Sequence, residues 1–502
     1  MDDLRRLVVE SGRRHALGGV AVGVVRRGEA PLVECIGVAD GVSGRRVDAD
    51  TVFRIASISK TLTAIGVMQL RDEGRFTLDD PVNDYLKTIR VESPRGAPEV
   101  TFRHLLTHTS GIGELPRVSD LWRREAWGGG PAFAAPSDLA ELYGGTLSTG
   151  VAPGSKWAYA NHGFAVLGQL VQDIAGRPFA DHMRERVLHP IGMERSDFVR
   201  TERVSDTLAT GYHWMFGRFR ALKDYDLTLL APGSVLSPLA DMLQYATWLA
   251  GARPDDRAAP LAPATLDEMM APQFSIDPRF DGMGLAFFLE HLGTHRACGH
   301  DGNNPGFASS LLVAPDDGVG VVVLTNTSTF VGAHLLAASV LRSVLGVADP
   351  AASLPRADVP SSPHLWTELI GPYAPAPGFL TNFRAWQTTG GEVEVFVKNR
   401  RLFVKALSPL PRLRRGLELF ATDNDDPLSF AIVIEGLVIP VAFRAGASGV
   451  VDTVCFGHPA TATFHRRTPW RSSRRRLTAT AGLGLVTAAV GMRSRRSRAT
   501  RR

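Results

Sequence analysis

The sequence predicts an α+β protein followed by a second, all-β domain, and three observations lead to this prediction. Strand-like segments lie at both ends of the first 345 residues, mainly helical and loop-like segments fill the region between them, and a further series of short strands follows a Pro-rich stretch. An antiparallel sheet formed from the two ends, with the helical part inserted, is the simplest arrangement. At 502 residues the chain is also too long for one ordinary core.

The first elements are a hairpin and a buried helix. Two runs of β-branched residues, 19–25 and 32–37, flank the turn sequence RRGE and predict the hairpin. The stretch FRIASISK, residues 53–60, is followed by apolar residues at helical spacing up to Leu70, and Gly74 is expected to end this helix.

The end of the first region predicts a helix and then a strand pair closed by another helix. Ser237 is expected to cap the first helix, with Pro238 at its first position. The two strands are joined by the turn sequence PDDG. The ranges are 239–249 for the first helix, 307–313 and 320–325 for the strands, and 331–345 for the closing helix.

Composition indicates where the domains divide. Residues 347–365 are rich in Pro, Ala and Ser, which is typical of a linker. After them, alternating short segments with turns predict a small barrel or sandwich. These segments are 392–397, 402–404, 430–434, 438–443 and 451–456. We therefore predict domains at 1–346 and 366–468 and a basic tail at 469–502.

The basic pI of 9.3 comes from the tail. Residues 471–502 contain ten arginines and no acidic residue, and the net +5 of the chain less the +10 of this segment leaves −5 for the rest. We therefore predict no nucleic-acid partner. The tail also holds an apolar run, 477–492, which as a helix would span about 24 Å, short of a hydrocarbon core of about 30 Å. We favour a disordered tail, with weak contact to a membrane surface as the alternative.

The cysteines and the N-terminus predict a cytoplasmic protein without a metal site. Cys35, Cys298 and Cys455 are scattered, and no CxxC pattern suggests a zinc site or a disulfide framework. The first residues lack the apolar core and the cleavage site of a signal peptide. Neither a cofactor nor a metal is predicted.

Ser57 and Lys60 are the first candidate catalytic residues. The chain has only six lysines among its 56 basic residues, so a retained lysine suggests a need for an amine that can lose its proton. If a helix begins near Ser57, the two side chains share a face, and burial would lower the pKa of the amine. Taken alone, the pair would more often be a capping serine and a surface lysine.

Two later groups of residues change this interpretation. Tyr159 and Asn161 form the chain's only Tyr-x-Asn, in a Pro-Gly turn that leads toward a helix at 164–175. A phenol can relay protons, and an amide can bind a substrate carbonyl or the amine. The stretch GHDGNN contains His300, Gly302 and Asn303 just before the strand at residue 307, where backbone could approach a ligand closely.

Together and in this order, the three motifs resemble the serine-reactive family of class C β-lactamases, D-alanyl-D-alanine carboxypeptidases, D-aminopeptidases and esterases. The related pattern is Ser-x-x-Lys, Ser-Asp-Asn and Lys-Thr-Gly, and here His300 stands in the lysine position of the third motif. The stretches 105–112 and 231–234 are also similar. The resemblance covers residues 10–345 and implies a β-lactamase/transpeptidase-like fold. The segment after the linker is similar to the small lipocalin-like barrel of some relatives.

The resemblance also implies roles for these residues. Ser57 would attack an acyl carbon, Lys60 and Tyr159 would share the proton transfers, and Asn161 would orient the substrate or the lysine. Backbone N–H groups of Ser57 and Asn303 would bind the oxyanion. His300, together with Gly302, would line the cleft opposite the nucleophile.

The histidine in place of lysine bears on the substrate. A fixed ammonium suits the carboxylate of penicillins, whereas a largely neutral His300 attracts it less. We therefore expect an esterase, amidase or D-amino-acid peptidase acting on a small molecule or peptide, with β-lactams as weak substrates. The alternatives are a binder of cell-wall fragments or acylated ligands that acylates slowly or not at all, and a scaffold at a membrane surface.

Overall fold

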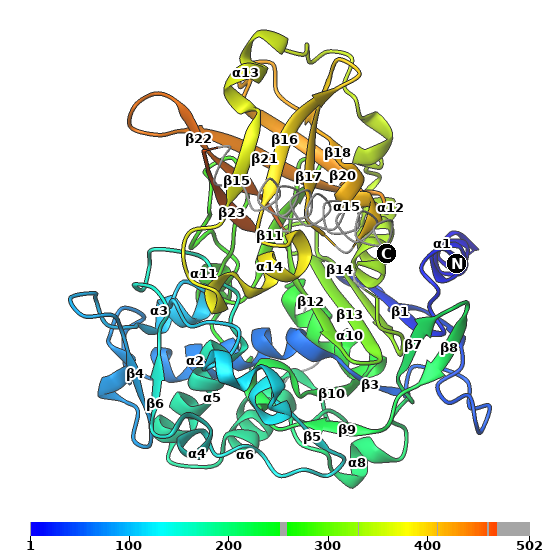
Figure 1. The fold of residues 1–502 in the computed structure, drawn as a ribbon. Coiled ribbons are helices and arrows are strands. Elements are labelled where there is room, and N and C mark those ends of the chain that lie inside the picture. The colour runs from blue at the N-terminus through cyan, green and yellow to red at the C-terminus, as the bar shows by residue number, and fades with distance from the viewer. Residues whose placement is uncertain (1, 252–258, 330, 409, 459–460, 469–502) are drawn as a thin grey trace, which may run out of the picture. The chain divides into compact units, whose positions relative to one another are not determined.

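The computed structural model shows two compact units, Met1–Ala352 and Ser353–Arg502 (Figure 1). The predicted linker, 347–365, contains this division and two short 3₁₀ helices. The structure describes residues 2–251, 259–329, 331–408, 410–458 and 461–468. The predicted tail, including its apolar run, lies outside the described residues. Across these ranges, no helix is both long and apolar enough to cross a membrane.

The first unit is built on a six-stranded antiparallel sheet in the order β11-β12-β13-β14-β1-β2. Its strands are β1 (Gly19–Arg26), β2 (Leu32–Gly37), β11 (Phe288–Leu292), β12 (His295–Asn304), β13 (Phe307–Ala314) and β14 (Val319–Thr325). β1 pairs directly with β14, with Val22 opposite Val323. The predicted sheet from the two ends of this region is therefore confirmed, but β11 and β12 were not predicted.

Both faces of this sheet are buried, because alternate residues along its strands enter two different cores. Val20, Val22 and Val24 of β1 pack in the core that also holds residues of α1 and α12, whereas Ala21 and Val25 pack in the core shared with α2, α5 and α10. These helices are α1 (Asp2–Arg14), α2 (Ser59–Asp72), α5 (Asn161–Ala175), α10 (Leu239–Leu249) and α12 (Gly332–Leu345). Helix α1 was not predicted, although its buried residues Leu4 and Val8 are four positions apart, which is a helical spacing.

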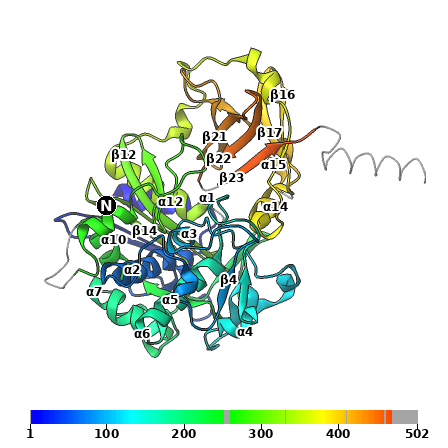
Figure 2. The same cartoon turned by 90° about the vertical axis from the view of Figure 1, so that its left-hand side faces the viewer.

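The inserted region lies on one side of the sheet in both views (Figures 1 and 2). It contains short strand pairs as well as the expected helices. The helices are α3 (Phe102–Leu106), α4 (Leu139–Tyr143), α6 (Phe179–Met183), α7 (His189–Ile191), α8 (Glu202–Ser205) and α9 (Leu230–Gly233), with α11 (Pro263–Met269) after α10. The strands are β3 (Val52–Arg54), β4 (Arg90–Glu92), β5 (Gly129–Pro131), β6 (Thr146–Ser148), β7 (Tyr212–Met215), β8 (Arg218–Ala221), β9 (Tyr225–Leu227) and β10 (Leu236–Pro238).

The predicted cap of α10 was wrong. Ser237 lies in β10, opposite Phe53 of β3, and its hydroxyl contacts that of Ser196 at 2.8 Å. Pro238 occupies the N-cap position instead. Strand pairing therefore overrode the capping preference of serine.

The second unit contains a nine-stranded antiparallel sheet in the order β18-β17-β16-β15-β23-β22-β21-β20-β19. Because β18 at one edge also contacts β20 near the other, the sheet nearly closes, as predicted for a barrel-like domain. Its strands are β15 (Gly371–Ala374), β16 (Val393–Lys398), β17 (Arg401–Ala406), β18 (Leu417–Glu418), β19 (Phe420–Ala421), β20 (Ser429–Ile434), β21 (Leu437–Ala445), β22 (Val451–Phe456) and β23 (Ala462–Arg466). Its helices are α13 (Trp366–Leu369), α14 (Phe383–Thr389) and α15 (Pro411–Arg415).

Candidate active site

Ser57 lies in a 3₁₀ turn, η1 (Ala56–Ile58), that connects β3 to α2. The α-helix begins at Ser59, two residues later than expected. Ala56, directly before Ser57, has a φ of 50°, a left-handed conformation that is strained for a residue with a side chain. Ser309 donates a hydrogen bond to the Ile55 carbonyl at 2.8 Å and helps to hold the strained turn in place. The half-buried Ser57 is therefore presented on a fixed turn.

Lys60 is fully buried one helical turn after Ser57, as the sequence predicted. Its amine nitrogen Nζ lies 3.0 Å from Ser57 Oγ, 2.9 Å from Asn161 Oδ1 and 2.7 Å from the Pro232 carbonyl oxygen. Of these three partners only Ser57 has a hydrogen to donate. A neutral Lys60 that donates to the other two can accept a hydrogen bond from the Ser57 hydroxyl, which is the contact that a general base needs.

Tyr159 lies against this lysine. The Lys60 nitrogen lies 4.8 Å from the centre of the Tyr159 ring, and the His108 ring stacks on the same Tyr159 ring with centres 4.2 Å apart. His108 is itself fixed by the backbone, because its Nδ1 accepts a hydrogen bond from the Ala160 N–H at 3.2 Å. Asn161 is the first residue of α5. The structure thus brings Ser57, Lys60, Tyr159 and Asn161 together.

His300 lies within β12, a strand that was not predicted and that directly precedes the predicted strand β13. It pairs with Leu311 of β13, and its buried ring lies 6.1 Å from the ring of Tyr159. Its Nδ1 lies 2.6 Å from the Asp301 carbonyl oxygen. Because a carbonyl only accepts, Nδ1 carries a hydrogen, and in the neutral form of the ring Nε2 is then an acceptor.

Gly302 allows β12 to approach the nucleophile turn. A β-carbon at this position would overlap the Ile55 carbonyl oxygen and the Ser309 hydroxyl, and would lie 3.0 Å from the Ala56 β-carbon. The glycine therefore serves close packing of β12 against η1 rather than a bend. The next residue, Asn303, is exposed and pairs with Ala308 of β13. The third motif thus lies beside Ser57.

Replacing Gly302 with alanine is expected to destabilise the protein by about 3 kcal/mol and to lower activity, because β12 and η1 must separate to admit the methyl group. Gly163 of α5 provides a matched control. A β-carbon there meets its nearest neighbour, Leu105, at an ordinary 3.6 Å, so Gly163→Ala is expected to stabilise by about 0.5 kcal/mol. Urea unfolding followed by circular dichroism measures both changes. Equal stability of the two variants would contradict the close-packing role of Gly302.

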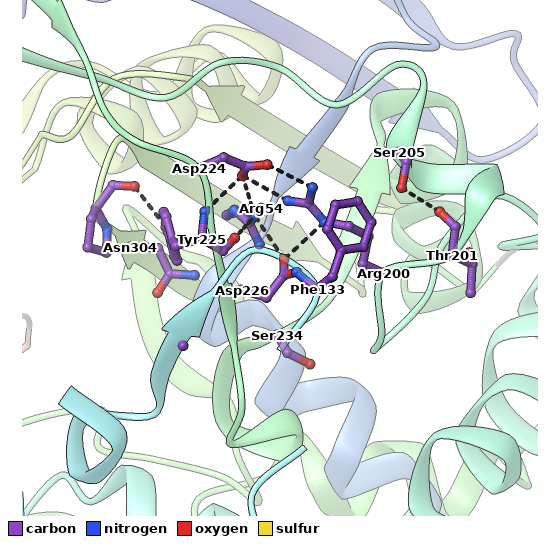
Figure 3. A network of polar contacts seen from close by, with 12 residues as sticks. Arg54, Phe133, Arg200, Thr201, Ser205, Asp224, Tyr225, Asp226, Ser234 and Asn304 are labelled. Atoms are coloured by element: carbon purple, nitrogen blue, oxygen red, sulfur yellow. Dashed lines mark hydrogen bonds and ion pairs between the residues drawn. The ribbon is translucent and has the colours of Figure 1, made fainter. Parts of the chain in front are cut away.

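A charged network that the sequence did not reveal is centred on Arg54, Arg200, Asp224 and Asp226 (Figure 3). Arg54, three residues before Ser57, is buried and forms ion pairs with Asp226 at 3.1 Å and Asp224 at 3.3 Å. Arg200 bridges the same two carboxylates at 3.1 and 2.7 Å. Two arginines therefore balance two aspartates, of which Asp226 is buried and Asp224 is half-exposed.

The same network reaches the end of β12. Tyr225, between the two aspartates, donates a hydrogen bond from its hydroxyl to the Pro305 carbonyl at 2.8 Å, and the Arg54 guanidinium lies over its ring at 4.4 Å. The strand before Ser57 and the turn after Asn303 are thus joined through β9. Only the fold could show this role of Arg54, because its acidic partners lie about 170 residues later.

Two further contributors were present in quoted motifs but had no assigned role. The stretch 105–112 supplies His108, which orients Tyr159, and the stretch 231–234 supplies the Pro232 carbonyl that accepts from Lys60. A separate hollow of about 490 Å³ is lined by residues between Met270 and Arg296. It contains none of the motif residues, so we do not place the site there.

The sequence model of the family described as Beta-lactamase matches residues 4–345 of the chain. This span contains every residue of the geometry above. The chain belongs to the beta-lactamase family.

Individual relatives agree with this assignment. Esterase EstB of Burkholderia gladioli is 36% identical over 206 residues, covering 40% of this chain and 51% of the esterase. The D-aminopeptidase of Brucella anthropi is 25% identical over 341 residues, covering 68% of this chain and 62% of the peptidase. The chain therefore spans between half and two thirds of the length of these relatives.

A solved structure extends the similarity to the second unit. The octameric penicillin-binding protein homologue from Pyrococcus abyssi matches 92% of this chain and 99% of its own, with a TM-score of 0.60 and 21% identity. At this identity the match shows the fold alone. The β-lactamase/transpeptidase-like fold followed by a barrel-like sheet is thus confirmed.

Proposed function

We propose that the protein is a serine hydrolase in which Ser57 forms an acyl-enzyme with an ester or amide substrate. The observation that supports this most directly is the contact of 3.0 Å between the buried Lys60 amine and the Ser57 hydroxyl, beside two partners that can only accept. A binder would not require a base aligned in this way. In the proposal Lys60 takes the Ser57 proton as the hydroxyl attacks the acyl carbon, and the resulting ammonium is held by Asn161 and the Pro232 carbonyl.

The remaining steps use the neighbouring groups. Tyr159, with its ring beside Lys60, gives its hydroxyl proton to the leaving group and takes a proton from the Lys60 ammonium, and the leaving group departs with the acyl group left on Ser57. The backbone N–H groups of Ser57 and Asn303 stabilise the oxyanion. Water then attacks the acyl-enzyme, and Lys60 accepts a proton from this water. The proton passes to Ser57 Oγ as the acid product leaves, which restores the serine.

We propose neutral, apolar acyl esters as the preferred substrates. With its hydrogen on Nδ1, a His300 ring in the neutral form presents an acceptor where a carboxylate-binding site needs a donor. Aromatic rings surround this position: Phe288 lies 5.1 Å from His300, and Trp157 lies 6.4 Å from Phe288. Such rings favour apolar groups over charged ones. The name of the esterase relative supports an ester as the substrate.

A labelling experiment combined with a substrate panel tests the proposal. We expect a fluorophosphonate probe to label the protein on the peptide that contains Ser57. We expect p-nitrophenyl butyrate to give the highest kcat/KM, D-alanine p-nitroanilide a lower one, and nitrocefin a value about 100-fold below the ester, corresponding to about 2.7 kcal/mol of lost transition-state stabilisation. Labelling elsewhere, or no labelling and no turnover, would favour the binder. Faster turnover of nitrocefin would overturn the substrate assignment.

A further inference from the structure

The hairpin formed by β7 and β8 carries a group of exposed aromatic side chains. It projects from the first unit as a two-stranded ribbon (Figure 1). Phe216 at its tip is 88% exposed, and Trp214 and Phe219 are 46% and 41% exposed. Most large apolar side chains of this unit are buried in its two cores. An exposed cluster of this kind on a projecting element indicates an interaction surface.

The two faces of the hairpin differ in character. Trp214 is paired opposite Phe219, with ring centres 4.7 Å apart, so the aromatic rings share one face. The other pairs are Met215 with Arg218 and His213 with Arg220, which gives a basic opposite face. The segment 211–223 also contains Lys223 and no acidic residue.

The tip residue is poorly suited to its backbone conformation. Phe216 and Gly217 both have positive φ, 51° and 76°, as the two central residues of a type I′ hairpin turn do. Asn or Gly is favoured at the first of these positions, and a bulky aromatic residue is strained there. Because the Phe216 ring is exposed, packing within the fold does not offset this strain. The ring is therefore suited to a contact outside the unit.

We propose that this hairpin docks tip-first on an anionic lipid surface, with Phe216 and Trp214 reaching the acyl boundary from one face and Arg218 and Arg220 reaching the phosphates from the other. Aromatic rings and arginines on one short element are typical of side chains at membrane interfaces. A projecting tip suits a deformable surface better than a rigid protein groove, and its positive charge complements anionic headgroups. The proposal is independent of Ser57 chemistry and of the tail.

Sedimentation of the full-length protein with vesicles tests the proposal. We expect binding to vesicles of equal parts phosphatidylcholine and phosphatidylglycerol, and much weaker binding to phosphatidylcholine alone. Phe216→Asn is expected to weaken partitioning by about tenfold or more, since burial of one phenylalanine ring contributes about 1.5–3 kcal/mol. The same variant creates an Asn-Gly turn, so its Tm should be equal or higher. Loss of lipid binding without loss of stability separates docking from misfolding.

Two further variants test the charge of the hairpin and provide a control at an exposed aromatic residue elsewhere. The double variant Arg218→Gln/Arg220→Gln is expected to weaken binding to the anionic vesicles by about thirtyfold at low salt. Trp122→Ala removes an aromatic ring of 94% exposure outside the hairpin and should bind as the wild type does. All variants keep the tail, so differences in their vesicle binding come from the hairpin.

The proposal is overturned if Phe216→Asn binds vesicles like the wild type, or if binding does not depend on the charge of the lipid. It also fails if light scattering shows that Phe216 mediates self-association without vesicle binding.

Discussion

Replacing Ser57 with alanine is expected to lower kcat/KM for esters by on the order of 10⁵-fold and to abolish fluorophosphonate labelling. The side chain is half-buried on a turn whose backbone is held by Ser309 and Ser59, not by its own hydroxyl. We therefore expect the unfolding free energy to change by less than about 1 kcal/mol. Ester kinetics, probe labelling and urea unfolding on the same preparation measure all three quantities.

Ser59 is the matched control for this variant because it is the nearest other serine. Its buried hydroxyl donates to the Ala56 carbonyl at 2.6 Å and accepts from the Val235 N–H at 3.1 Å. Ser59→Ala leaves that N–H without this acceptor and is expected to cost about 1–3 kcal/mol of stability. It should nevertheless retain labelling and most of the activity. If Ser59→Ala lost labelling and Ser57→Ala kept it, the nucleophile would be misassigned.

Replacing Lys60 with methionine is expected to slow acylation by about 10³-fold, the range of a lost general base. Methionine has a similar length and no amine, so it removes the proton acceptor while filling the buried site. The Asn161 Oδ1 and the Pro232 carbonyl lose a donor, and we expect a stability loss of about 1–3 kcal/mol. The measurements are the second-order rate constant of probe labelling and the Tm.

Lys398→Met provides the control for the loss of a lysine. Lys398 is exposed at the end of β16 in the second unit, and its replacement should leave the labelling rate unchanged. Retention of a tenth or more of the wild-type rate in Lys60→Met, where about a thousandth is expected, would transfer the base role to Tyr159. A Tyr159→Phe variant would then show the larger loss.

Much of the fold was predictable because the relevant signals are local. The β-branched runs of β1 and β14, the apolar residues of β13 and the turn sequence PDDG specify strands that are buried on both faces. By contrast, β11 and β12 contain many polar residues and glycines, which disrupt the apolar pattern. Pairing in register with β13, for example Cys298 with Val313, makes β12 a strand despite its composition.

The candidate site was also predictable only in part from the sequence. The sequence by itself determined the chemistry: Ser57 and Lys60 are three residues apart, so one turn of helix brings them together wherever that helix packs. Only the tertiary structure decided which way the lysine donates, because Asn161 and the Pro232 carbonyl come from segments about 100 and 170 residues away. It also decided that Arg54 supports the turn and that His300 lies inside a strand. Spacing fixes contacts within one helical turn, whereas contacts between distant segments depend on how the two cores pack.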